Sequence, residues 1–260
     1  MSGPVIVFDS GLGGLTVLAA LARARVRLDC FYVADDAGFP YGEYGDEELA
    51  MRVVGIISGL IGAHAPALAV IACNSASTLV LARLRARFAI GFVGTVPAIK
   101  PAALSTRSGL ISVLATPATV RRDYTRALIA EHAAGASVTL VGARDLARIA
   151  EERAAGHIVD PDAVAAEICP AFVERGGART DTVVLACTHF PLLIDELRAA
   201  APWPVAWIDP APAIARRVCD LLSPAPGSLT HRFLATSGAR IDDRAARILD
   251  RLIDSAPAGG

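Results

Sequence analysis

Two cysteines stand at matching points of the sequence, each where an apolar run gives way to small polar residues. Cys73 lies within AVIACNSAS and Cys187 within VVLACTHF, 114 positions apart. Each run predicts a buried strand followed by a helix, so each thiol would lie at a strand's carboxyl end. Ligands of open α/β sheets bind at these ends. Two such units facing each other would direct both thiols at one ligand.

Packing is the usual role of a cysteine, which behaves as a small hydrophobe when buried. This role suits Cys30, Cys169 and Cys219. It suits Cys73 and Cys187 poorly, because hydroxyl and amide groups begin directly after both of them. Three chemical roles are therefore open to this pair.

A zinc site usually has closely spaced ligands such as C-x-x-C or H-x-x-x-H, and the sequence contains neither pattern. Dithiol redox sites usually use C-x-x-C as well, although a long-range pair stays open. Acid–base chemistry is the third role. A thiol titrates near about 8.5, and lower beside a helix N-terminus or a cation. One thiolate and one thiol could then take a proton from one face of a carbon and return it on the other.

The glycine-rich stretch FDSGLGGLT, residues 8–16, has two interpretations. A strand, a glycine-rich turn and a helix are typical of dinucleotide binding, but Thr16 stands where the third glycine of G-x-G-x-x-G belongs. The same turn could offer backbone N–H groups to a carboxylate. Asp9 and Ser10 would then contact an ammonium group or orient a thiol. Capping of the helix by Asp9 alone is equally open.

Other polar residues have both structural and chemical interpretations. Thr116 and Thr119 in TPAT follow a predicted strand, and helix capping explains at least one of them. FPYGEYG, residues 39–45, is typical of a solvated turn. His189 could bind a backbone carbonyl, but its closeness to Cys187 favours an acid–base role.

The composition excludes several classes of function. The chain has 260 residues with 25 basic and 26 acidic side chains, which gives no field for nucleic acid or an anionic membrane. Five cysteines without regular spacing indicate a reducing compartment rather than a disulfide framework. No uncharged apolar run approaches the roughly 20 residues that span a bilayer, and Asp9 interrupts the N-terminal apolar stretch where a signal peptide would continue. We expect a soluble cytoplasmic protein.

Short apolar runs alternate with Ala/Leu/Arg-rich stretches of helical spacing. The runs predict strands at residues 4–8, 30–34, 67–72, 109–115, 137–142 and 182–186, and residues 35–49 are predicted to form a loop. Nearly continuous apolar strands that alternate with helices predict parallel sheets covered on both faces. The proline-containing stretch at residues 94–102 marks the boundary between two such α/β units.

Seven motifs over nearly the whole chain carry a resemblance to a known family. They are FDSGLGGLT, PYGEY, ACNSAS, VPAIKPA, ATPAT, ACTHFPLL and WIDPAPAIARRV. In these motifs the chain resembles the glutamate racemases of the aspartate/glutamate racemase superfamily. The resemblance implies an α/β fold of two pseudo-symmetric domains with mainly parallel sheets covered by helices, and an active site in the interdomain cleft. It implies a first domain of residues 1–97 and 208–260 and a second of residues 98–207.

The resemblance also implies the activity and its setting. Family members interconvert L- and D-glutamate without PLP, metal or any other cofactor, and supply D-glutamate for peptidoglycan. Glutamate would be the small-molecule partner, with no nucleic acid or membrane required. A homodimer is an assembly that the family often forms.

Site residues carry over by matching position. Cys73 and Cys187 correspond to the two opposed bases, the first acting on the D-enantiomer and the second on the L-enantiomer. Asp9 and His189 correspond to the groups that assist them. The implied substrate contacts are Ser10, Pro40, Tyr41, Gly42, Asn74, Ser75, Thr116, Thr119, Glu151 and Thr188.

The chain departs from the family pattern at several points. Ser75 stands for the usual Thr, Phe190 replaces a common Tyr, and residues 142–156 diverge most. Glu151 lies in this divergent segment, where we match it to a family acidic residue near the substrate ammonium. The departures leave the choice between glutamate and aspartate open.

The Cα–H bond of an amino acid is very weakly acidic, and PLP chemistry would need a Schiff-base lysine. The single lysine, Lys100, lies between two prolines. Placed donors would have to stabilise the developing charge instead: the glycine-rich turn, Asn74, Ser10, Ser75 and Thr188. The alternatives are a superfamily enzyme acting on aspartate, a hydantoin or maleate, a non-catalytic amino-acid-binding protein and a nucleotide-binding oxidoreductase.

Overall fold

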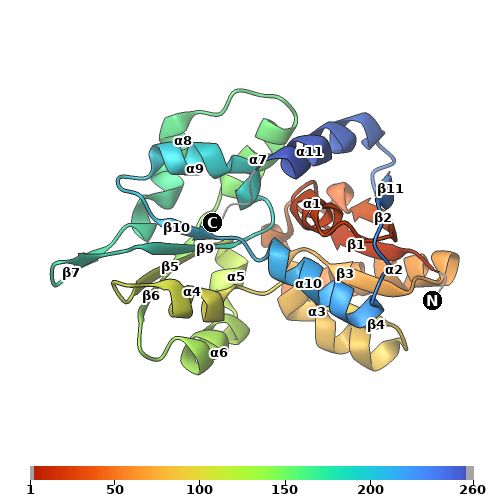
Figure 1. Cartoon of the computed structure of the whole chain (residues 1–260), viewed down its shortest axis with the longest axis horizontal. Helices are drawn as coiled ribbons and strands as arrows, with labels where there is room; N and C mark the ends of the chain where they lie inside the picture. The colour runs from red at the N-terminus through yellow and green to blue at the C-terminus, as the bar shows by residue number, and fades with distance from the viewer. Residues whose placement is uncertain (1–2, 256–260) are drawn as a thin grey trace. The chain divides into compact units, whose positions relative to one another are not determined.

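The computed structural model (Figure 1) describes residues 3–255 and divides them into two compact units. Unit 1 comprises residues 3–95 and 211–255, and unit 2 comprises residues 96–210. The predicted domain boundaries, after residues 97 and 207, stand beside these divisions after Thr95 and Pro210.

Unit 1 is built on a parallel five-stranded sheet in the order β11-β2-β1-β3-β4. In Figure 1 the blue C-terminal strand β11 lies beside the N-terminal strand β2, although about 200 residues separate them along the chain. The strands are β1 (Val5–Asp9), β2 (Leu28–Ala34), β3 (Leu68–Ile71), β4 (Gly91–Gly94) and β11 (Leu229–Ala235).

Helices cover this sheet because its central strands are apolar on both faces. Every residue of β1 and β3 is buried. Helices α2 and α3 pack against one face in a single core cluster, and α1 packs against α10 and α11. The helical elements are α1 (Leu15–Arg23), η1 (Asp36–Gly38), η2 (Tyr41–Glu43), α2 (Asp46–His64), α3 (Asn74–Arg87), α10 (Ala211–Leu222) and α11 (Asp242–Asp254).

Unit 2 contains a parallel four-stranded sheet in the order β10-β9-β5-β6, with a small antiparallel hairpin extending from it (Figure 1). Its strands are β5 (Leu110–Ala115), β6 (Ser137–Gly142), β9 (Thr182–Ala186), β10 (Ala206–Ile208) and the hairpin strands β7 (Glu174–Arg175) and β8 (Ala178–Arg179). Its helical elements are α4 (Ile99–Ser105), α5 (Pro117–Arg121), α6 (Asp123–His132), α7 (Leu146–Ala154), α8 (Pro161–Ile168), η3 (Cys169–Ala171), η4 (Phe190–Leu193) and α9 (Ile194–Ala200).

The two units share one topology. The first four strands of unit 1 lie across their sheet in the order β2-β1-β3-β4. The four strands of the parallel sheet in unit 2 lie in the equivalent order, β6-β5-β9-β10. Among the strands of the parallel sheets, the third in chain order is β3 in unit 1 and β9 in unit 2. Cys73 follows the first of these strands and Cys187 follows the second. The predicted α/β class with mainly parallel sheets is therefore confirmed, and the two cysteines occupy equivalent topological positions.

The predicted strands are confirmed as β1, β2, β3, β5, β6 and β9, but the predicted loop at residues 35–49 is too long. Helix α2 begins at Asp46, and its first turn holds Asp46, Glu47 and Glu48. Acidic side chains favour this position because they complement the positive end of the helix dipole. Pattern reading therefore mistook a charged helix start for a loop.

The other cysteines differ in their surroundings. Cys30 is fully buried in β2, and this burial, with the nearby charge of Asp29, raises the pKa of its thiol to about 12. It is a packing residue, as predicted. The prediction for Cys169 is wrong, since this residue begins the short η3 turn and is exposed, and Cys219 is only half-buried. No helix within residues 3–255 is long and apolar enough to cross a bilayer.

Asp181 fastens the end of α4 to the start of β9. Its carboxylate accepts hydrogen bonds from the Thr106 hydroxyl at 2.7 Å and from the backbone N–H groups of Arg107 and Ser108 at 2.7 and 2.8 Å. The Thr182 hydroxyl donates a fourth at 2.9 Å. Burial alone would raise the pKa of Asp181, but these hydrogen bonds outweigh it and lower the pKa to about 2.

We predict that Asp181→Asn lowers the free energy of unfolding by about 1–2 kcal/mol at pH 7. The neutral amide has one acceptor oxygen in place of two charged ones, so it cannot accept all four hydrogen bonds of the carboxylate. The pKa of Asp181 is depressed in the folded state, so its contribution is complete above its ordinary pKa of 3.8 and is lost as pH falls through about 2. Urea unfolding at several pH values measures the difference. Asp195→Asn, at an exposed carboxylate, is the control. Equal stability of wild type and Asp181→Asn at pH 7 would show that these hydrogen bonds do not stabilise the fold.

Candidate active site

The unit 1 half of the candidate site lies at the carboxyl ends of β1 and β3. Asp9 is the last residue of β1, and Cys73 follows β3, which pairs directly with β1. The Ala72 N–H donates to the Phe8 carbonyl at 2.7 Å and continues this pairing to the residue before the thiol. Asp9 is 0% exposed and Cys73 is 6% exposed. The parallel register therefore brings a carboxylate and a thiol to one sheet edge.

The Asp9 carboxylate binds the turn that starts α1. It accepts hydrogen bonds from the Ser10 N–H at 2.7 Å and from the Gly14 N–H, and Gly14 is the cap residue of α1. Capping thus accounts for part of the role of Asp9. The two backbone N–H donors thus fix the Asp9 carboxylate beside the strand end that carries Cys73.

Gly14 has no room for a side chain. A Cβ atom there would lie 2.8 Å from the Asp9 Cβ, 3.1 Å from the Tyr32 hydroxyl and 3.2 Å from the Ala72 Cβ. The Tyr32 hydroxyl in turn donates to the Gly11 carbonyl at 2.7 Å. The close packing of the turn on β1 and β2 therefore explains this glycine of the GLGG motif.

Cys73 is the N-cap residue of α3, and Asn74 and Ser75 form its first turn. The N-terminus of a helix favours a negative charge, so this position suits a thiolate or the carboxylate of a ligand. Asn74 is 2% exposed, and neither its amide oxygen nor its amide nitrogen has a hydrogen-bond partner among the described residues. Buried amides are normally satisfied, so this one is suited to a polar ligand.

The PYG turn has a buried residue between two accessible ones. Tyr41 is buried in the same core cluster as Cys73, while Pro40 is half-buried and Gly42 is exposed. The Tyr41 hydroxyl donates to the Asp35 carboxylate at 2.6 Å. The turn is thus anchored through its tyrosine at the edge that carries Cys73.

The unit 2 half lies at the carboxyl ends of β5 and β9. Ala115 pairs with Ala186, so the residues that follow them, Thr116 and Cys187, leave neighbouring strands at the same level. The Thr116 hydroxyl accepts from the Thr119 N–H at 3.3 Å and caps α5, as the capping interpretation predicts. Thr116 and Thr119 also share a hydrogen bond between their hydroxyls, at 3.0 Å.

Cys187, His189 and Glu151 form a hydrogen-bonded chain. The Cys187 Sγ lies 3.9 Å from Nδ1 of His189, and Nε2 of His189 lies 2.7 Å from a carboxylate oxygen of Glu151. His189 is 2% exposed. A carboxylate that accepts the Nε2 hydrogen leaves Nδ1 toward the sulfur, where it can exchange a proton with the thiol. Glu151 comes from α7, which packs against η4.

The structure thus groups the predicted residues within each unit. In unit 1 the strand ends and the PYG turn hold Asp9, Ser10, Pro40, Tyr41, Gly42, Cys73, Asn74 and Ser75. In unit 2 the buried Thr188 lies between Cys187 and His189, with Thr116 and Thr119 on the neighbouring strand end and Glu151 on α7. Each half contains one thiol and one buried acid–base partner.

Two residues of this region were missed from the sequence, Asp35 and Arg52. Asp35 directly follows β2, the strand next to β1, and a polar residue at that strand end was the available signal. Arg52 lies within α2, and no sequence pattern distinguishes it from the other surface arginines. Within the described part of the chain, no three His, Cys, Asp or Glu side chains gather as a metal site requires.

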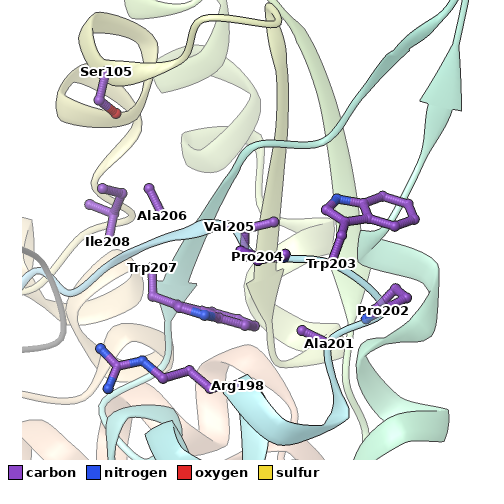
Figure 2. A pocket seen from close by; sticks show the side chains of 10 residues that line it. All are labelled: Ser105, Arg198, Ala201, Pro202, Trp203, Pro204, Val205, Ala206, Trp207 and Ile208. Atoms are coloured by element: carbon purple, nitrogen blue, oxygen red, sulfur yellow. The ribbon is translucent and has the colours of Figure 1, made fainter.

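A separate hollow of about 720 Å³ surrounds β10 on unit 2 (Figure 2). Trp203, Trp207 and Arg198 line it together with prolines and small side chains. Figure 2 shows the Arg198 side chain extending beneath the Trp207 ring. None of the predicted site residues lines this hollow.

Comparison with known proteins defines the class. Residues 6–218 match the family of Asp/Glu/hydantoin racemases, so the chain belongs to this family. It is accordingly an amino-acid racemase, an isomerase.

The similar proteins within this family are named glutamate racemase. The chain is 53% identical to the glutamate racemase of Brucella anthropi over 95% of this chain and 90% of the relative. It is 55% identical to that of Brucella ovis over 84% of this chain and 79% of the relative. The crystal structure of Escherichia coli glutamate racemase in complex with L-glutamate and the activator UDP-MurNAc-Ala is 37% identical. It has a TM-score of 0.85 and covers 96% of this chain and 95% of that one.

We predict that Gly14→Ala lowers the free energy of unfolding by about 1–3 kcal/mol, because the added methyl group overpacks the space between Asp9 and Tyr32. Thermal or urea unfolding measures this loss. Gly59→Ala is the matched control, since an added Cβ in the middle of α2 meets no atom within 4 Å. The control should be as stable as wild type or more so. A Gly14→Ala protein with wild-type stability would show that the turn can relax.

Proposed function

We propose that the protein is a glutamate racemase that uses Cys73 and Cys187 as two opposed acid–base groups. The observation that carries the proposal is the equivalent placement of the two thiols, each after the third strand, in chain order, of its own unit's parallel sheet. The family match and the relatives named glutamate racemase support glutamate as the substrate.

Racemisation moves one proton off Cα and one proton on. The Cys73 thiolate removes the α-proton of D-glutamate and becomes a thiol, and the electron pair of the C–H bond stays on the substrate. The Cys187 thiol then donates its proton to the opposite face of Cα and becomes a thiolate. The product is L-glutamate. Reaction in the reverse direction restores both sulfur atoms to their first states.

Donors at the strand ends would bind the substrate and stabilise the charge that develops on it. The first turn of α3 offers backbone N–H groups next to Cys73, together with the unsatisfied amide of Asn74. Ser10, Ser75, Thr116, Thr119 and Thr188 would contribute hydroxyl groups. Pro40, Tyr41 and Gly42 would close the substrate pocket from the PYG turn.

A carboxylate and an imidazole would tune the two thiols. His189 can hold the proton of Cys187 because its far nitrogen is bound to Glu151 at 2.7 Å. Asp9 would serve the Cys73 side from the neighbouring strand end. Two-base catalysis needs one sulfur atom ionised and the other protonated, so each thiol would need an acid–base partner of this kind.

The chemistry we propose needs no cofactor. A PLP enzyme would need a lysine at the reacting carbon, and the only lysine in the sequence, Lys100, is exposed on α4. We place the reaction in the cytoplasm, where it would supply D-glutamate for peptidoglycan. A homodimer stays a prediction for the assembly.

We predict that racemisation in D₂O places one solvent deuterium at Cα of the product enantiomer, because each thiol exchanges its proton with solvent. Mass spectrometry after chiral separation measures the label. Cys73→Ser and Cys187→Ser should each lower kcat by about 10³-fold or more, since a hydroxyl is a far weaker acid–base group. Cys169→Ser, at an exposed cysteine, is the control and should keep wild-type activity.

Product without deuterium, or full activity in either cysteine variant, would contradict the two-base mechanism. Binding of glutamate by calorimetry without any change of chirality would indicate a non-catalytic amino-acid-binding protein. Faster turnover of aspartate than of glutamate would reassign the substrate within the same family.

We predict that Glu151→Gln lowers kcat/KM by roughly tenfold or more, because His189 loses the carboxylate that stabilises its charged form. Free enantiomers have equal energies, so kcat/KM must fall by the same factor in both directions. The Cα-deuterium isotope effect should rise more from L-glutamate, where Cys187 removes the proton. Glu152→Gln is the matched control, because its carboxylate pairs only with exposed Arg148 in the described residues. Equal effects of the two substitutions would contradict the role of Glu151.

A further inference from the structure

Asp35 is the centre of a second hydrogen-bond network in unit 1. Its carboxylate accepts hydrogen bonds from Nε and a terminal nitrogen of Arg52, both at 2.6 Å, from the Tyr41 hydroxyl at 2.6 Å and from the Thr236 hydroxyl at 2.5 Å. Asp35 is fully buried. Four donors from three separate segments therefore converge on one carboxylate.

The charge of Asp35 depends on these donors. Burial alone would raise the pKa of Asp35, but hydrogen bonds from Arg52, Thr236 and Tyr41 outweigh it and hold the pKa below its ordinary value. Arg52 is the only cation among the donors, and its fork binds both carboxylate oxygens. Without Arg52, a buried charge would face Tyr41 uncompensated, which is costly.

Gly38, which has no side chain, leaves the space that the Arg52–Asp35 pair occupies. A Cβ atom there would collide with the Arg52 guanidinium and would come within 2.7 Å of the Asp35 carboxylate. Gly38 lies two residues before Pro40, in the short turn that leads into the PYG segment. The guanidinium therefore packs directly against the chain that enters the proposed substrate-binding turn.

The C-terminal strand completes the network. Ala235 of β11 pairs with Ala34 of β2, and the Thr236 N–H donates to the Ala34 carbonyl at 2.9 Å. This register directs the Thr236 hydroxyl to Asp35. The next residue, Ser237, donates from its backbone N–H to Asp36 at 2.9 Å. Residues 35 and 36 are thus tied both to α2 and to the end of the last strand.

We infer that Arg52 is a positioning residue: through Asp35 it fixes Tyr41, and thereby the Pro40–Gly42 turn that would contact glutamate. The inference rests on the proposed function for its substrate. The Thr236 hydroxyl shares this role from the C-terminal strand. Arg52 acts on the turn through Asp35 and Tyr41 and through its packing against Gly38, and it touches no proposed acid–base group, so its loss affects binding more than the chemical step.

The test compares Arg52→Gln and Arg52→Lys with Arg83→Gln. Arg83 makes the same forked pair, with Glu47 at 2.8 and 2.7 Å, but both side chains are exposed at the surface of α2 and α3. Arg52→Gln should raise KM for glutamate about tenfold, the value of one lost charged hydrogen bond, with kcat changed much less. Arg52→Lys should recover part of the loss, and Arg83→Gln should match wild type.

Hydrogen exchange of residues 38–44, measured without substrate, gives a readout independent of catalysis. Exchange there should accelerate in Arg52→Gln and stay unchanged in Arg83→Gln. Thr236→Val removes one donor and keeps the charge pair, so it should raise KM and loop exchange to a smaller extent. It serves as the test if Arg52→Gln does not fold.

The outcomes separate the two proposals. Wild-type KM together with wild-type exchange in Arg52→Gln would overturn the positioning role, as would a loss of stability with neither change. A wild-type protein without racemase activity would overturn the proposed function instead. The exchange measurement would then still decide whether Arg52 holds the turn.

Discussion

The parallel register of the sheets is the constraint on which the rest of the structure depends. Because β1 pairs with β3 and β5 pairs with β9, the carboxyl ends of these strands stand side by side. The residues beyond those ends therefore gather without any closeness in sequence. Cys73 and Cys187 each emerge at this level of their own sheet. Proton transfer at a weakly acidic Cα–H bond, as we propose it, would require thiols held in this fixed way.

Buried charges are the second feature, and each has partners. Asp9 is bound by the backbone of the glycine-rich turn, Asp35 by Arg52 and two hydroxyls, and His189 by Glu151. Removing a charge from water is costly unless hydrogen bonds replace the lost solvation. For Asp35 these partners hold the pKa of the carboxylate below its ordinary value. They also hold each side chain in one conformation, so the groups at the strand ends have fixed positions.

The sequence predicts the local part of this account well. Apolar runs predict six of the strands, and the matching contexts of the two cysteines predict their equivalent positions. Contacts between residues far apart in the chain could not be predicted from local sequence patterns. Arg52 reaches Asp35 from the next helix, Glu151 reaches His189 across 38 positions, and β11 returns to β2 from the far end of the chain. Local periodicity carries no information on such pairings, which depend on how the helices pack. The start of α2 was missed for a different reason, because its acidic first turn looks like a loop.

The central claim is that two sulfur atoms from separate units act on opposite faces of one carbon. A crystal structure of the protein with bound glutamate tests it most directly. We predict both Sγ atoms within about 3.5 Å of Cα, one on each face. A complex in which only one sulfur atom approaches Cα, or both approach the same face, would contradict it.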